Sequence, residues 1–292
     1  MRFLRGLLYV VLGLVVLAVL LAGGIWFASD RALAARITPP AATFDATGGD
    51  VARGRHFVAS TLDCTGCHRA HLDGATLIND PMLATIAATN LTRGAGGIGA
   101  TFTDTDFERA IRHGLRPDGT RLVVMPSEAF SALSDADLRD VIAYVRSFPP
   151  VDRSTPARSL GPIGRLGLVL GKFTFEADHI DQAAPHAAAQ PPAADAVYGR
   201  YLAHIGSCYD CHSANLAGGK SIGGIPAANI TPAAIGTWSL GQFETTLRKG
   251  VDPSGRHLRA MPWRAIGKMS DLELTALYTF LKTVPRVTTP NT

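Results

Sequence analysis

The sequence predicts an all-α protein in which an N-terminal transmembrane helix precedes two tandem copies of one helical domain. Residues 6–28 form an apolar run without a charged side chain. The rest of the chain contains a long internal repeat, and apolar residues recur in it at helical spacing, without a convincing strand-like alternation. The 292 residues are sufficient for two domains of ordinary size.

The apolar run is the first element. Its 23 residues can cross a bilayer core of roughly 30 Å at about 1.5 Å of rise per residue. Arg2 and Arg5 precede it, so a secretory signal peptide is the alternative to an uncleaved anchor. The run is longer than the apolar region of most signal peptides, and Trp26 is typical of a membrane interface. We expect an anchor at residues 1–28 and a tether at 29–45.

The repeat defines the two domains. Its copies open with "GRHFVASTLDCTGCHRAHLDG" and "GRYLAHIGSCYDCHSANLAGG". Residues 107–151 align without a gap with residues 243–287, and 15 of these 45 positions are identical. The repeat predicts domains at residues 46–152 and 195–292, joined by a linker at residues 153–194 whose C-terminal half is rich in alanine and proline.

The last helix of each copy has the clearest boundaries. Ser134 and Ser270 are followed three residues later by an acidic residue, as in an N-terminal capping box, and prolines stop both helices. A shorter helix in each copy ends at Gly114 or Gly250, which suit a left-handed C-terminal position.

All four cysteines lie in two Cys-x-x-Cys-His motifs, formed by Cys64, Cys67 and His68 and by Cys208, Cys211 and His212. Cysteines three residues apart share one face of a helical turn and can form thioethers at one edge of a porphyrin. The motifs therefore predict two covalently bound haem c groups, with both histidines as axial iron ligands. A zinc site or a thioredoxin-like dithiol would leave the histidines and the duplication unexplained.

The second axial ligand is expected from the "VVMPS" and "RAMPW" segments, which place Met125 and Met261 at equivalent repeat positions. Met82 and Met269 lack this symmetry and are expected to serve packing. The alternative iron ligands near the motifs are His71, His113 and His257. A histidine–methionine pair raises the reduction potential and fills both axial positions, so the iron would carry electrons and bind no substrate.

Four further residues occupy matching places near the motifs. Phe102 and Trp238 are expected to pack against the porphyrins. Asn90 and Asn229 either form hydrogen bonds near the haem propionates or hold a turn.

The net charge of the chain and the place where haem is attached limit the possible functions and locations of the protein. The formal net charge is only +4 and no basic run occurs, so the sequence does not indicate nucleic-acid binding. Covalent haem attachment takes place outside the cytoplasmic membrane. We therefore expect a single-pass protein of the bacterial inner membrane with its haem domains in the periplasm.

The motif combination "GSCYDCHSANLAGGK", "ANIT", "IGTW" and "AMPW" resembles the haem modules in cytochrome c subunits of bacterial membrane-bound dehydrogenases that oxidise alcohols or gluconate. The resemblance covers both copies. It implies histidine–methionine haem c sites and electron intake from a periplasmic or membrane-bound dehydrogenase. The implied acceptor is a respiratory oxidase, a quinone-linked complex or a small cytochrome. Those subunits commonly carry three modules, and this chain has two.

The sequence thus favours an electron-transfer protein without substrate chemistry of its own. The alternative is a dihaem redox enzyme, such as a thiosulfate dehydrogenase or a peroxidase, in which one iron is open. The matching Met-Pro pair favours the electron carrier.

Overall fold

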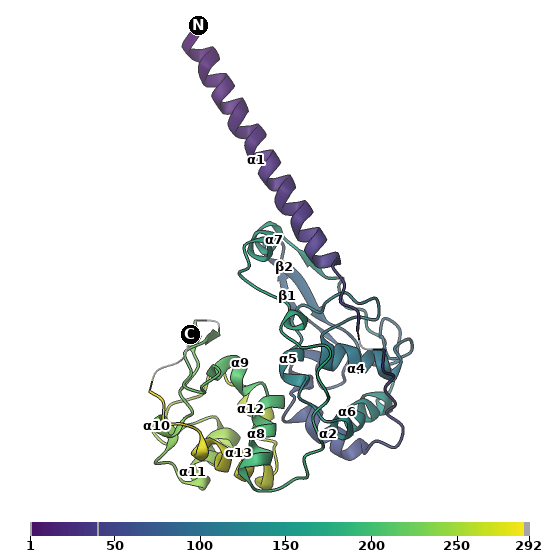
Figure 1. Ribbon diagram of the computed structural model, residues 1–292, viewed down its shortest axis with the longest axis vertical. Helices are drawn as coiled ribbons and strands as arrows, with labels where there is room; N and C mark the ends of the chain where they lie inside the picture. Colours follow the sequence, from purple (N-terminus) through teal and green to yellow (C-terminus); the bar gives the residue numbers. More distant parts are fainter. Residues whose placement is uncertain (1, 40, 223, 289–292) are drawn as a thin grey trace.

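The computed structural model describes residues 2–39, 41–222 and 224–288. The chain is mostly helical, and one long helix, α1 (Arg2–Ala34), projects away from two modules that pack side by side (Figure 1). Within the described residues, α1 alone is long and apolar enough to cross a membrane. The expected helical character and the apolar N-terminal helix are confirmed.

Five helices of each module occur in the same order. In the first module they are α2 (Val51–Ala59), α3 (Cys64–His68), α4 (Asp104–His113), α5 (Ser127–Phe130) and α6 (Asp135–Ser147). Their counterparts are α8 (Ala196–Ile205), α9 (Cys208–His212), α11 (Leu240–Lys249), α12 (Trp263–Ile266) and α13 (Asp271–Thr283). The second module adds α10 (Pro232–Ile235), and the linker contains α7 (Pro162–Val169) and a short 3₁₀ turn at Glu176–Asp178.

The first helix of each module packs tightly against the last. A Cβ atom at Gly54 of α2 would lie 1.9 Å from the Asp140 carbonyl oxygen on α6, and one at Gly199 of α8 would lie 1.9 Å from that of Ala276 on α13. Only glycine permits this approach. The predicted N-caps are confirmed, because Ser134 and Ser270 each accept a hydrogen bond from the third residue of their helix at 3.2 Å.

Small sheets are the main departure from the all-α prediction. The first module contains a hairpin of β1 (Ala75–Asp80) and β2 (Ala84–Ala88), extended by β3 (Ser159–Leu160) from the linker. In the described residues of the second module, the one sheet pairs β4 (Ser221–Ile222) with β5 (Ile225–Pro226). The prediction missed β1 because its side chains do not alternate between buried and exposed, so a period of two is absent.

The hairpin supports a second, smaller apolar core. Ala84, Ile86 and Leu160 are buried there, and Leu33 of α1 and Leu168 of α7 pack against them. The long helix, α7 and the hairpin therefore form one unit attached to the first module (Figure 1).

Described residues of segment 29–45, the predicted tether, contact the first module. Helix α1 continues to Ala34, and the Ile37 amide donates a hydrogen bond to the Gly119 carbonyl at 3.0 Å. Further on, the Phe44 amide donates to Thr105 Oγ1 at 2.9 Å. These contacts use backbone amides, which explains why the sequence shows no apolar pattern for them.

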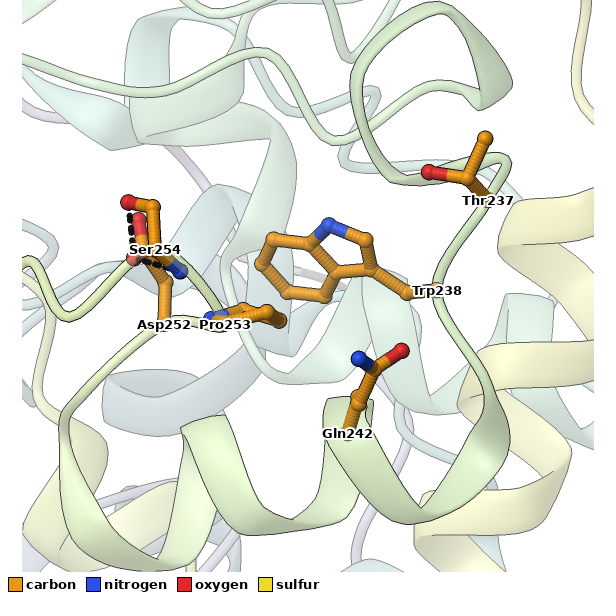
Figure 2. Close-up of a pocket in the computed structure, with 6 residues that line it drawn as sticks. All are labelled: Thr237, Trp238, Gln242, Asp252, Pro253 and Ser254. Carbon is orange, nitrogen blue, oxygen red and sulfur yellow. Dashed lines mark hydrogen bonds between the residues drawn. The ribbon is translucent and has the colours of Figure 1, made fainter.

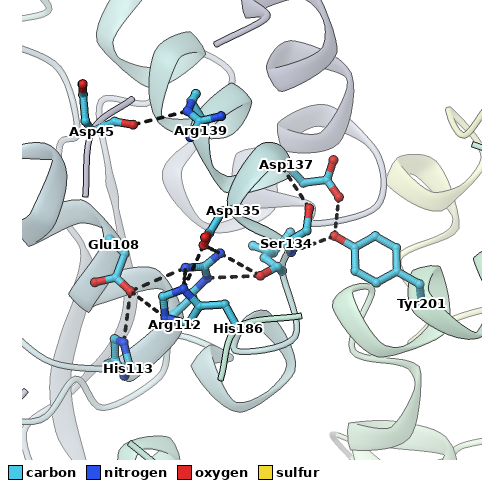
Figure 3. Close-up of polar contacts among 11 residues, drawn as sticks. Asp45, Glu108, Arg112, His113, Ser134, Asp135, Asp137, Arg139, His186 and Tyr201 are labelled. Carbon is cyan, nitrogen blue, oxygen red and sulfur yellow. Dashed lines mark hydrogen bonds and ion pairs between the residues drawn. The ribbon is translucent and has the colours of Figure 1, made fainter. Parts of the chain in front are cut away.

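The two modules meet through equivalent positions. The Tyr201 hydroxyl of α8 donates to the Asp137 carboxylate of α6 and accepts from the Ser134 amide at 3.1 Å (Figure 3). On the other side, His56 Nε2 of α2 lies 2.7 Å from Glu273 Oε2 of α13. Each module thus places a side chain of its first helix against the acidic N-terminus of the other's last helix. The interface has approximate two-fold symmetry.

Candidate haem sites

Each Cys-x-x-Cys-His motif forms a short helix enclosed by left-handed backbone. Among the described residues, the non-glycine residues with positive φ form three pairs, each 144 positions apart: Asp63 and Ser207, Arg69 and Ser213, and Leu72 and Leu216. Such conformations cost about 1–3 kcal/mol each and cluster at functional sites. Both copies keep them, which indicates the same geometric requirement around each motif.

The two motif histidines are oriented identically. His68 Nδ1 lies 2.7 Å from the Thr89 carbonyl oxygen, and His212 Nδ1 lies 2.7 Å from that of Ala228. A carbonyl only accepts, so Nδ1–H is the donor and Nε2 keeps its lone pair for a metal. Burial lowers the pKa of both rings, which favours the neutral imidazole that binds metals.

The two asparagines hold the loops that supply these carbonyl groups. Asn90 Nδ2 donates to the Val151 carbonyl at 2.8 Å, and Asn229 Nδ2 donates to the Val287 carbonyl at 2.7 Å. Their side-chain oxygens accept from the amides of Thr92 and Thr231. Of the two roles considered for them, the structure shows the holding of a turn.

None of the four cysteines forms a disulfide bond, so all four are available for attachment of a cofactor. Burial raises the pKa of Cys64 and of Cys208 to about 12, so both thiols stay protonated at neutral pH. In the described part of the chain, the group of side chains with metal-ligand spacing contains no cysteine. The cysteine pairs fit attachment of a haem on each motif better than a shared zinc site.

The two proposed methionine ligands occupy equivalent loops. Both are half-buried against the apolar core, and the carbonyl of each accepts an amide two residues later at 2.8 Å as α5 or α12 begins. Of the other methionines, Met269 is buried at 2% exposure, as expected for packing, whereas Met82 is 51% exposed. Met82 is therefore not a packing residue of this chain.

The aromatic residues assigned to the porphyrins border the core. Phe102 packs edge-on against Phe107 with ring centroids 5.5 Å apart. Trp238 is half-buried and forms one wall of a pocket of about 440 Å³, opposite the turn at residues 252–254 (Figure 2). Both side chains keep part of their surface available to a flat group.

A polar cluster centred on the C-terminal half of α4 was not predicted from the sequence. His113 Nε2 lies 3.0 Å from Glu108 Oε1, and its Nδ1 lies 2.7 Å from Gln182 Oε1. Arg112 and His186 complete the cluster (Figure 3). Both ring nitrogens of His113 are occupied, and His71 and His257 are exposed. Helical spacing from Glu108 to Arg112 was the available signal, but Gln182 and His186 come from the linker.

Comparisons with known proteins identify a family for the first module. The family model for cytochrome c matches residues 51–149, which correspond to the first module. The chain is 31% identical to the fructose dehydrogenase cytochrome subunit of Gluconobacter japonicus, over 80% of this chain and 52% of the relative. It is 29% identical to the cytochrome c subunit of the quinone alcohol dehydrogenase of Gluconacetobacter polyoxogenes, over 86% of this chain and 59% of the relative.

A third relative, a dihaem c-type cytochrome of Cereibacter sphaeroides, is 28% identical over 65% of this chain and 68% of its own length. The chain spans somewhat more than half the length of the two dehydrogenase subunits. The chain belongs to the cytochrome c family, and cytochrome c subunits of dehydrogenases and a dihaem cytochrome c are among its homologues.

Proposed function

We propose that this chain is a membrane-anchored dihaem c-type cytochrome that transfers electrons singly from a periplasmic dehydrogenase towards the respiratory chain. The observation that carries the proposal is the duplicated histidine geometry. In both modules a backbone carbonyl fixes Nδ1–H of the motif histidine and leaves Nε2 free. A covalently bound haem c supplies an iron that alternates between the ferric and ferrous states.

The chain's own residues would hold each group in the same way. Cys64 and Cys67 would attach the first haem, and Cys208 and Cys211 the second. His68 and His212 would supply one axial nitrogen each. Met125 and Met261 would supply the opposite sulfur. In support, the ring nitrogens of His113 are occupied by Glu108 and Gln182.

The arrangement of the modules suits transfer between two sites. A Cβ atom added to Gly206, which precedes Cys208, would lie 3.5 Å from the Thr61 carbonyl oxygen, which precedes Cys64. The segments leading into the two motifs therefore touch. The apolar core is continuous across both modules, which keeps this approach fixed.

The donor follows from the relatives, whose names describe cytochrome subunits of fructose, alcohol and gluconate dehydrogenases. We place the anchor in the bacterial inner membrane and the modules in the periplasm. The acceptor would be a respiratory oxidase, a quinone-linked complex or a small cytochrome.

The test uses membranes from a bacterium that produces the full chain and from a strain lacking its gene. Fructose, ethanol or gluconate is added anaerobically, and the reduced haem c absorption is recorded. We expect one of these substrates to produce a reduced haem c signal in membranes that contain the chain, and a smaller signal in membranes that lack it. The dehydrogenase for that substrate should co-purify with the chain in detergent. Substrate-dependent respiration that is equal in both strains would argue against the proposal.

A further inference from the structure

Helix α7 and the hairpin of β1 and β2 lie beside the end of α1 on the first module (Figure 1). Exposed apolar side chains gather at this place. They come from α7 and from the turn between β1 and β2. We name this surface the α7 patch; its members, between 40 and 60% exposed, are Met82, Leu83, Ile163, Leu166, Val169 and Leu170.

The two parts of the α7 patch are joined by backbone contacts. The Ile163 amide donates to the Met82 carbonyl at 2.9 Å. A Cβ atom at Gly164 would lie 2.1 Å from the Leu83 carbonyl oxygen, so the hairpin turn abuts the first turn of α7. The patch is therefore one surface built from two segments distant in sequence.

The exposed face of α7 is not needed for the core. Ile163, Leu166 and Leu170 have the spacing of one helical stripe. Leu168 faces elsewhere and packs on the small apolar core. A stripe of large apolar side chains left in water indicates a surface that is covered in use.

Arg165 fixes α7 to the end of the apolar helix. Its guanidinium lies 4.3 Å from the ring centroid of Trp26, and Nη1 lies 2.7 Å from Ser29 Oγ and 2.6 Å from Asp30 Oδ1. The Ser29 side chain is fully buried by this contact. Trp26 closes the charge-free run, at the level where tryptophan prefers the membrane–water interface. The α7 patch is held at that level.

We propose that the α7 patch rests in the interfacial layer of the same bilayer that α1 crosses. The partner is lipid, because the patch adjoins the apolar surface of the spanning helix and is held beside it by Arg165. The inference rests on the proposed anchor. Met82 and Leu83 lie in the turn of the β1–β2 hairpin. In the described residues of the second module, the matching place holds the shorter pair β4 and β5. We therefore expect the first module, and not the second, to lie against the membrane.

The experiment places a nitroxide on single added cysteines of the full-length holoprotein in vesicles of phosphatidylethanolamine and phosphatidylglycerol. Leu170→Cys reports on the α7 patch and Leu14→Cys on the middle of α1. Val197→Cys, at 56% exposure on α8 of the second module, is the matched control. The unsubstituted protein should take up no label, because its cysteines are bound to haem. Collision rates with oxygen, which concentrates in lipid, and with a water-soluble nickel chelate are compared.

We expect a severalfold higher oxygen-to-nickel collision ratio at position 170 than at position 197, and the highest ratio at position 14. If position 14 is in lipid but position 170 matches position 197, the bilayer contact is overturned and the α7 patch is left for a protein partner. If position 14 is itself in water, the anchor fails, and with it the membrane part of the proposed function.

Discussion

Two carbonyl oxygens orient the motif histidines, and each depends on the asparagine that follows it in the chain. Asn90 is fully buried and donates to two carbonyl groups, those of Val151 and Arg153, at 2.8 and 3.0 Å. Its side chain also accepts the Thr92 amide at 2.9 Å. Loss of this side chain would leave buried polar groups without partners, which is costly.

Replacement of Asn90 by alanine should lower the free energy of unfolding by about 1–3 kcal/mol, because buried partners lose their hydrogen bonds. Chemical denaturation of the holoprotein measures the loss. Asn79→Ala, at an exposed position of β1, is the control and should change little. Equal stability of the two variants would show that the asparagine does not hold the loop.

The proposed methionine ligands give the second prediction at this scale. Met125→Ala and Met261→Ala should each open one iron to carbon monoxide and lower the reduction potential of that haem, because the thioether favours the ferrous state. Carbon monoxide titration should give one site per chain in each variant and none in the unsubstituted protein. Met82→Ala is the control. Binding by the unsubstituted protein would instead favour the alternative of a dihaem enzyme.

At the scale of the elements, two contacts join the helices of the two modules. One joins His56 to Glu273, and the other joins Tyr201 to Asp137. The hydrogen bond with Glu273 raises the pKa of His56 above its ordinary value, against the effect of partial burial. Burial alone would raise the pKa of Glu273, but hydrogen bonds from His56 and the Ser270 amide hold it below its ordinary value. Burial, and next to it the negative charge of Asp137, raise the pKa of Tyr201. The phenol therefore stays protonated in this contact.

The pKa shifts of His56 and Glu273 determine how the stability of the fold depends on pH. A raised histidine pKa stabilises the fold below the unfolded value of 6.5, and this contribution disappears as the pH rises through the folded value. A lowered glutamate pKa stabilises above 4.5, and that contribution disappears as the pH falls through the folded value. The pair therefore contributes most between these two pH values.

We expect the stability difference between the unsubstituted protein and His56→Gln to shrink as the pH is raised from about 5.5 to about 8.5. Thermal unfolding of the holoprotein at each pH measures it. Tyr201→Phe removes the equivalent contact and should cost the same amount at each pH. A pH-independent cost for His56→Gln would show that the pair is not charged in the folded protein.

The sequence predicted the elements that carry local signals. The capping serines Ser134 and Ser270 and the glycine ends of α4 and α11 follow from short-range chemistry, and the structure confirms them. The cross-module partners of His56 and Tyr201 could not be predicted, because Asp137 and Glu273 were already explained as capping residues. A contact between two copies leaves no pattern within either copy.

The same limit applies to the candidate sites. The repeat led us to predict the cysteines, histidines and methionines as site residues, but the carbonyl partners at Thr89 and Ala228 emerge only from the folded loops. The hairpin β1–β2 was missed because the burial of β1 has no period of two and because most side chains of β2 are small. Residues 29–45 were expected to be a tether, because the partners of Ser29, Asp30 and Phe44 lie far away in the sequence, at Arg165 and Thr105.

At the scale of the whole molecule, α1 is joined to the first module, while the second module lies farther from α1 (Figure 1). This arrangement would keep the haem domains near an integral redox partner by raising the effective concentration of the pair. A chain in which a cleavable signal peptide replaces residues 1–28 should keep its haem spectrum, but membranes should oxidise it more slowly. Equal oxidation rates of anchored and soluble forms at matched amounts would show that delivery does not need the anchor.

The central claim is that each module binds one covalent haem c. Pyridine haemochrome spectroscopy of the purified full-length protein, combined with iron and zinc quantitation, tests it most directly. The account predicts two haems and two irons per chain, both resistant to acid–acetone extraction, and no zinc. One haem per chain, extractable haem, or zinc in stoichiometric amount would contradict it.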